Sequence, residues 1–171
     1  MTGVAAALAL SVAPVPAVAQ EAQEPPPVTV PALTDWAPES GSYAFGADTR
    51  LVADSAVERR VAGTLADDLR AAGHGTVPVV RGGARTGDIV IDVRPGKASL
   101  GAEGYELHAG KRLSVTGATE TGAFYGTRTL LQLLAQGDRV PAGRTVDVPR
   151  YQERGVGVCA TAYEGLQGLG S

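Results

Sequence analysis

Apolar residues recur at every fourth position in the first of two segments that have one apolar and one polar face. The stripe consists of Val57, Val61, Leu65 and Leu69. Residues with this spacing lie on one face of a helix. Ser55 and Glu58 match a capping box at the start of the segment, and Gly73 suits a left-handed cap at its end. The pattern predicts an amphipathic helix that begins after Ser55 and ends before Gly73.

A second apolar pattern predicts a helix from about Thr119 to Gln136. Its apolar positions are Ala123, Phe124, Leu130, Leu131, Leu133 and Leu134. Gly122 and Gly126 are four residues apart and share one side of this helix, although glycine costs about 1 kcal/mol relative to alanine inside a helix. The pair indicates a close approach of the helix backbone to a sheet. Two tolerated glycines without a packing role are the alternative.

Short runs of β-branched and alternating residues predict seven strands around these helices. The runs are 43–45, 50–53, 77–80, 88–93, 104–109, 112–117 and 145–148. Only two turn residues, Gly110 and Lys111, separate the fifth run from the sixth, which indicates a β-hairpin. The order β-β-α-β-β-β-β-α-β predicts an α+β fold, in which a mixed or mostly antiparallel sheet carries both helices on one face.

The first 38 residues differ in character from the rest of the chain. Residues 1–19 contain an apolar stretch, without a preceding Lys or Arg, and end in the triplet Ala-Val-Ala at 17–19. This small-residue pattern is typical of a signal-peptidase site and predicts a secreted protein. A buried helix is the alternative, which Pro14 and Pro16 disfavour. The proline-rich residues 20–38 predict an extended linker with few backbone partners.

Composition excludes several classes of protein. The chain of 171 residues has 15 Lys and Arg against 18 Asp and Glu, and this balance has the wrong sign for binding nucleic acid through phosphates. A single cysteine, Cys159, excludes a disulfide within the chain, and with two histidines it does not make a usual zinc site. The N-terminal apolar stretch is too short to span a bilayer. We therefore expect no cofactor, no metal, no nucleic-acid partner and no membrane span.

Motifs of catalysis are absent from the sequence. It contains no phosphate-binding loop, no G-x-S-x-G nucleophile elbow and no H-E-x-x-H pair. His74 and His108 have no partner at a ligand spacing, so we expect structural histidines. Asp67 and Asp68 are adjacent on a predicted helix and point about 100° apart, so we expect solvated carboxylates rather than an acid–base dyad.

The second half of the chain resembles a known family. Residues 104–117 read GYELHAGKRLSVTG, residues 121–134 read TGAFYGTRTLLQLL, and residues 147–155 read DVPRYQERG. These segments are similar to the N-terminal, non-catalytic domain of family 20 β-N-acetylhexosaminidases. The resemblance extends from about Asp35 to Val158.

The resemblance implies an α+β domain over 39–149 and, over 150–171, the start of a (β/α)8 barrel on which that domain packs. In the family the barrel hydrolyses terminal N-acetylhexosamine residues of glycans with substrate assistance, using an Asp-Glu pair that has no counterpart in this sequence. Arg154 matches the family arginine that binds hydroxyls of the sugar at the non-reducing end, or is an exposed strand-end arginine. Cys159 stands where most members have an aspartate. A barrel needs about 250 residues, so the resemblance implies a truncated chain without turnover of its own.

Two alternatives to an accessory domain stay open. An independent secreted carbohydrate-binding or interaction module would also carry an export signal, but aromatic residues make up only 5% of the chain. Trp36 and Tyr43 are its candidate sugar contacts, because we expect Tyr105, Phe124 and Tyr125 in the core. A non-functional remnant is the other alternative, and it predicts an exposed apolar face where the barrel would dock.

Overall fold

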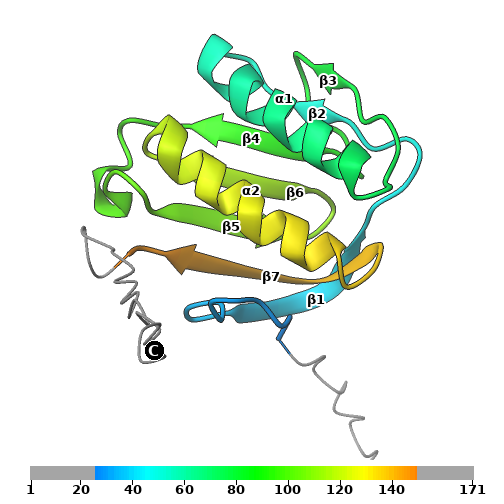
Figure 1. Cartoon of the computed structure of the whole chain (residues 1–171). Coiled ribbons are helices and arrows are strands. Elements are labelled where there is room, and N and C mark those ends of the chain that lie inside the picture. Colours follow the sequence, from blue (N-terminus) through cyan, green and yellow to red (C-terminus); the bar gives the residue numbers. More distant parts are fainter. Residues whose placement is uncertain (1–25, 150–171) are drawn as a thin grey trace, which may run out of the picture.

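Seven strands and two helices make up the part of the chain that the computed structural model describes, residues 26–149 (Figure 1). In chain order the elements are β1 Ala37–Ala44, β2 Leu51–Val52, α1 Ala56–Ala71, β3 Val79–Val80, β4 Ile89–Val93, the short 3₁₀ helix η1 Ala98–Leu100, β5 Tyr105–Ala109, β6 Leu113–Gly117, α2 Glu120–Leu134 and β7 Arg139–Asp147. The strands and helices follow the predicted order, and the α+β fold is confirmed.

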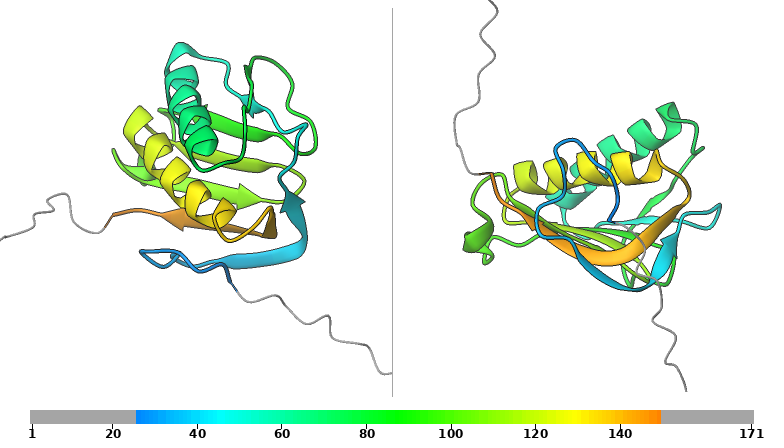
Figure 2. Two further views of the ribbon diagram at one scale, coloured as in Figure 1. Left: turned by 45° about the vertical axis from the view of Figure 1, so that its right-hand side comes forward. Right: turned by 90° about the horizontal axis from the view of Figure 1, so that it is seen from below.

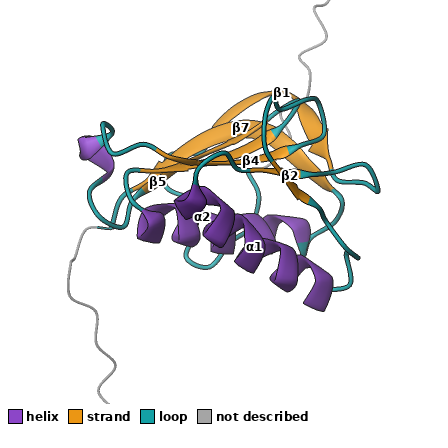
Figure 3. Cartoon of the chain, turned by 90° about the horizontal axis from the view of Figure 1, so that it is seen from above, coloured by secondary structure: helices purple, strands orange, loops and turns teal. Residues whose placement is uncertain are grey.

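The sheet is divided into an antiparallel and a parallel half. Its strand order is β1-β7-β5-β6-β4-β2-β3. The pairs β1–β7, β7–β5 and β5–β6 are antiparallel, whereas β6–β4, β4–β2 and β2–β3 are parallel. Helix α1 supplies the crossover that joins the parallel neighbours β2 and β3. Both helices cover the same face, and the other face carries neither of them (Figure 3).

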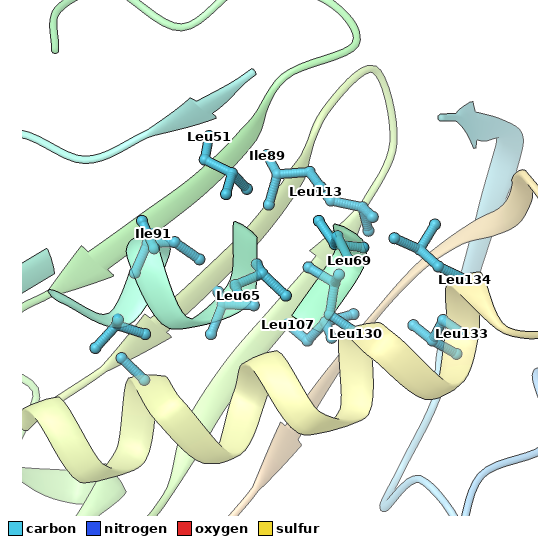
Figure 4. Packing of buried hydrophobic residues seen from close by; sticks show 14 of the residues in the cluster. Leu51, Leu65, Leu69, Ile89, Ile91, Leu107, Leu113, Leu130, Leu133 and Leu134 are labelled. Carbon is cyan, nitrogen blue, oxygen red and sulfur yellow. The ribbon is translucent and has the colours of Figure 1, made fainter. Parts of the chain in front are cut away.

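The core lies between this sheet and the two helices (Figure 4). Successive side chains of a strand point to opposite faces, so alternate residues of the central strands face the helices. The fully buried leucine and isoleucine side chains of the core are Leu51, Leu65, Leu69, Ile89, Ile91, Leu107, Leu113, Leu130, Leu133 and Leu134. Both predicted apolar stripes therefore meet at one interface with the sheet.

Helix α1 is fixed at its first turn by a buried glutamate. Ser55 and Glu58 form the predicted capping box. The Glu58 carboxylate accepts the backbone N–H groups of Asp54 at 3.1 Å, Ser55 at 2.7 Å and Val93 at 3.0 Å. Burial raises the pKa of Glu58, but the hydrogen bonds from these donors together lower it by more than burial raises it. The pKa of Glu58 therefore lies below its ordinary value. One carboxylate thus ties the start of α1 to the end of β4.

Helix α2 sits on the sheet through glycines. A Cβ atom on Gly122 would lie 2.3 Å from the carbonyl oxygen of Gly104, and one on Gly126 would lie 2.3 Å from Cγ1 of Val115. No side chain fits at that distance, so the helix backbone comes as close to β5 and β6 as these glycines allow. The predicted close approach is confirmed. Thr119 caps the helix by accepting the N–H of Gly122 at 3.1 Å.

The outer antiparallel strands are longer than predicted. β1 begins at Ala37 rather than at residue 43, and β7 begins at Arg139 rather than at residue 145. These two strands pair with each other around an irregularity between Pro38 and Ser42. Proline can occupy an edge strand when its missing N–H faces away from the ladder, so Pro38 marks no boundary here.

The expectation of a linker with few partners is wrong for its last part. Residues 26–36, which we call the strap, contact α2 through Val28 and Val30 and reach β7 at Thr34 and Trp36. The side-chain amide of Gln132 accepts the N–H of Val30 at 2.8 Å and donates to its carbonyl at 3.0 Å. Gln136 does the same for Val28, at 3.2 and 2.7 Å. The valines between the prolines keep their backbone donors, and two side-chain amides on the helix satisfy them.

Candidate docking surface

Two ion pairs bridge α1 and α2 on the side that faces away from the sheet. Arg60 of α1 donates to both carboxylate oxygens of Glu120 in α2, at 2.9 and 2.7 Å. Hydrogen bonding to Arg60 lowers the pKa of Glu120 below its ordinary value. Arg128 of α2 approaches Asp68 of α1 at 2.6 Å. Solvent-exposed pairs add little stability, so their main effect is to define the shape and charge of this surface.

Aromatic rings lie beside these bridges on α2. The guanidinium of Arg128 stands 4.5 Å from the ring centre of Phe124, within the range of a cation–π contact. The rings of Phe124 and Tyr125 have centres 6.0 Å apart. Both side chains are half-buried, so only the predicted burial of Tyr105 is fully correct. Gly122 and Gly126 occupy the side against the sheet, and Phe124 and Tyr125 pack partly buried against the core.

The outer side of the helix pair is hollowed at both ends. One hollow of about 370 Å³ lies between the first turns and is lined by Arg60, Val61, Thr64, Glu120, Thr121, Phe124 and Tyr125. The other, of about 710 Å³, lies between the last turns and includes Asp68, His74, Leu131 and Asp138 in its lining. Asp68, expected as a solvated carboxylate, instead forms the bridge to Arg128. We call this outer surface of α1 and α2 the helix layer surface.

The last described strand ends beside the helix layer. Asp147 of β7 pairs with Tyr105 of β5. The residue before Tyr105 is Gly104, whose carbonyl lies against Gly122 in the first turn of α2. The right-hand view of Figure 2 shows the end of β7 rising from the sheet to the level of the helices. The chain therefore leaves the described domain next to the first turn of α2.

The residues singled out in the sequence fall in different places. Arg154 and Cys159 lie outside the described residues. His74 packs edge-on against Phe45 with ring centres 5.0 Å apart, and His108 bonds Glu39 at 2.9 Å. Within 26–149, no three His, Cys, Asp or Glu side chains gather closely enough to hold a metal ion. The same span has no helix of the length and apolarity that crossing a membrane requires.

The contacts of Gln132 and Gln136 are ones that the sequence patterns did not reveal. They hold the strap against α2 through four hydrogen bonds. Two amides four residues apart on one helix side were a visible signal. Their partners lie more than 100 positions away in the chain, and no local pattern connects the two segments.

The described residues form one α+β layer, a mixed sheet with both helices on one face. The family described as glycosyl hydrolase family 20, domain 2, matches residues 26–148. The chain belongs to this family.

Named relatives agree with this assignment. A lacto-N-biosidase of Bifidobacterium bifidum is 39% identical over 137 residues, which cover 78% of this chain and 12% of the relative. The solved GH20 β-N-acetylhexosaminidase of Streptomyces coelicolor A3(2) is 30% identical with a TM-score of 0.61, over 71% of this chain and 26% of the other. A mutant β-hexosaminidase of Streptomyces plicatus in complex with its product GlcNAc is 32% identical with a TM-score of 0.62, over the same shares. The chain thus matches between about an eighth and a quarter of these relatives.

Proposed function

We propose that this chain is the accessory domain of an exported β-N-acetylhexosaminidase-like glycoside hydrolase. The observation that carries the proposal is the family match over residues 26–148, together with relatives whose names are those of glycosidases. The small-residue triplet at 17–19 supports export. The parent enzyme would act on glycans that end in N-acetylhexosamine.

The helix layer surface is the proposed contact with a (β/α)8 catalytic barrel. Half-buried aromatic rings and two hollows supply shape and apolar area for a partner. The described chain ends beside the first turn of α2, so a domain that follows it would begin next to this surface. Arg154 would then lie on the first barrel strand, where its planar guanidinium can donate to sugar hydroxyls.

The 171-residue chain is expected to have no turnover by itself, because the catalytic Asp-Glu pair of the family has no counterpart in its sequence. We expect no chromophore release from an aryl N-acetylglucosaminide, with the Streptomyces coelicolor enzyme as a positive control. Protein-dependent release by the purified chain would contradict this expectation.

A chimera tests the proposed docking. Residues 26–149 replace the corresponding domain of the Streptomyces coelicolor enzyme, and the chimera should hydrolyse the aryl substrate. Thr64 is exposed and lines a hollow of the helix layer surface, so Thr64→Arg should lower the thermal midpoint and activity of the chimera. Thr86→Arg, in an exposed loop away from that surface, is the matched control. Equal effects of both substitutions, with both isolated chains folded, would place the contact elsewhere.

A further inference from the structure

The sheet face that carries no helix has a hollow of its own, of about 1010 Å³. Its floor includes Val90 of β4 and Ser114 and Thr116 of β6, and its rim includes the β5–β6 turn and the loop 82–84. Three contacts brace that loop: Gly82 donates to Asp54 at 2.8 Å, Arg50 donates to the carbonyl of Gly83 at 3.5 Å, and Arg112 donates to the carbonyl of Ala84 at 3.2 Å. The rim is therefore built by tethered backbone.

Hydrogen-bonding groups follow β6 along the floor of this hollow. Arg112, Ser114 and Thr116 alternate in sequence, so they share the open face of the strand. Within residues 26–149 the hydroxyls of Ser114 and Thr116 have no hydrogen-bond partner, although Thr116 is only 9% exposed. Hydroxyls can donate and accept, and these two face the space above the sheet.

Positive charge is left over at one end of the hollow. Three acids line the hollow: Glu39 bonds His108 at 2.9 Å, Asp92 pairs with Arg94 at 2.7 Å, and Asp54 accepts the backbone N–H of Gly82 at 2.8 Å. In contrast, the side chain of Lys111 has no partner among the described residues, and the side chain of Arg112 donates only one hydrogen bond within them, to the backbone carbonyl of Ala84. The uncompensated charge at the β5–β6 turn therefore favours an anionic group.

We propose that this hollow binds an anionic saccharide. Its acidic substituent, a sulfate ester or a carboxylate, would lie at Lys111 and Arg112, and its ring hydroxyls would bond Ser114 and Thr116. A planar guanidinium beside an ammonium suits either acid. The site lies on the opposite face from the helix layer surface, so it stays open when a barrel docks there and does not depend on that docking.

Calorimetric titration of the 171-residue chain tests the site with four probes: N-acetylglucosamine 6-sulfate, glucuronic acid, N-acetylglucosamine and inorganic sulfate. We expect at least one acidic sugar to bind about tenfold or more tightly than the neutral sugar and than sulfate alone, because charged hydrogen bonds add to those of the ring. The double substitution Lys111→Gln with Arg112→Gln should weaken the acidic sugar by about tenfold or more. Ser114→Ala should weaken it by a smaller factor.

Arg70→Gln is the matched control, because Arg70 is an exposed arginine on α1, on the other side of the sheet. It should leave binding unchanged, and thermal unfolding should show that all variants fold. Three outcomes would overturn the proposal: no saturable binding of either acidic sugar, equal affinity for inorganic sulfate, or equal weakening by the control and the double variant.

Discussion

The two helices rest on the same sheet in opposite ways. Helix α1 is anchored by large side chains such as Leu65 and Leu69, which are fully buried, and by the carboxylate of Glu58 at its first turn. Helix α2 is drawn in until its backbone nearly touches the strands at Gly122 and Gly126. The α1 interface therefore depends on large buried side chains, whereas this part of the α2 interface depends on glycines that have no side chain.

This difference decides which changes each helix tolerates. Removing side-chain volume under α1 leaves a cavity, since protein interiors are close-packed. Adding a single methyl group under α2 instead pushes against the carbonyl of Gly104, and a backbone atom yields less readily than a flexible side chain. Four substitutions test this difference.

Leu65→Ala should have the largest effect. The side chain is fully buried between α1 and the sheet, so its truncation should lower the free energy of unfolding by about 2–5 kcal/mol. Urea denaturation followed by circular dichroism measures the change. A loss below about 1 kcal/mol would mean that α1 closes over the space, and the α1 interface would then not depend on its large side chains.

The same Gly→Ala change on each helix gives the sharpest contrast. Gly122→Ala should destabilise the protein by about 1–3 kcal/mol through overpacking. A Cβ atom on Gly63 of α1 would meet no atom within 4 Å, so Gly63→Ala should instead stabilise by about 0.4–1 kcal/mol, because alanine restricts the unfolded chain and favours the helix. Thermal unfolding should move in opposite directions for the two variants. Shifts of the same sign would remove the distinction between the two interfaces.

Glu58→Gln tests the remaining anchor of α1. The backbone donors bond both carboxylate oxygens of Glu58, whereas a glutamine offers them only one acceptor oxygen. The variant's free energy of unfolding should therefore fall by about 1–3 kcal/mol at pH 7. The folded protein holds the pKa of Glu58 below its ordinary value. The carboxylate therefore stabilises the fold above the ordinary glutamate pKa, and this contribution disappears as the pH falls through the lowered value.

The stability difference between wild type and Glu58→Gln should consequently be largest near neutral pH and should shrink below about pH 4. Denaturation at a series of pH values measures it. A difference that stays constant as carboxylates are protonated at acid pH would show that the charge of Glu58 contributes nothing to the anchor.

Local patterns predicted the elements of this fold because local physics determines them. The capping box at Ser55 and Glu58, the apolar spacing of α1 and the β5–β6 hairpin each involve residues close together in sequence. The hairpin turn, predicted at Gly110 and Lys111, also includes Arg112 in the structure. The glycine pair of α2 was informative for the same reason, since an unfavourable residue repeated on one side of a helix indicates a contact that needs it.

Long-range contacts were beyond the sequence. The extension of β1 and β7 depends on the mutual pairing of two strands that lie far apart in the chain. The bridge from Arg128 to Asp68 depends on how two helices lie side by side, which neither helix encodes alone. The candidate surfaces share this property, because the hollow above β6 gathers residues from β1, β4, β5 and distant loops.

The hydrogen bonds from Gln132 and Gln136 to the strap have a consequence for sequence variation. Both amides hold the strap through backbone atoms of Val28 and Val30, residues that are 76% and 81% exposed. Residues 28 and 30 therefore tolerate other side chains that accept an extended backbone. Glutamate at position 132 or 136 would lack the NH2 group that donates to the strap carbonyl. Deamidation of either one would place a carboxylate against a carbonyl oxygen, so chemical ageing of this protein would begin to release the strap without any cut in the chain.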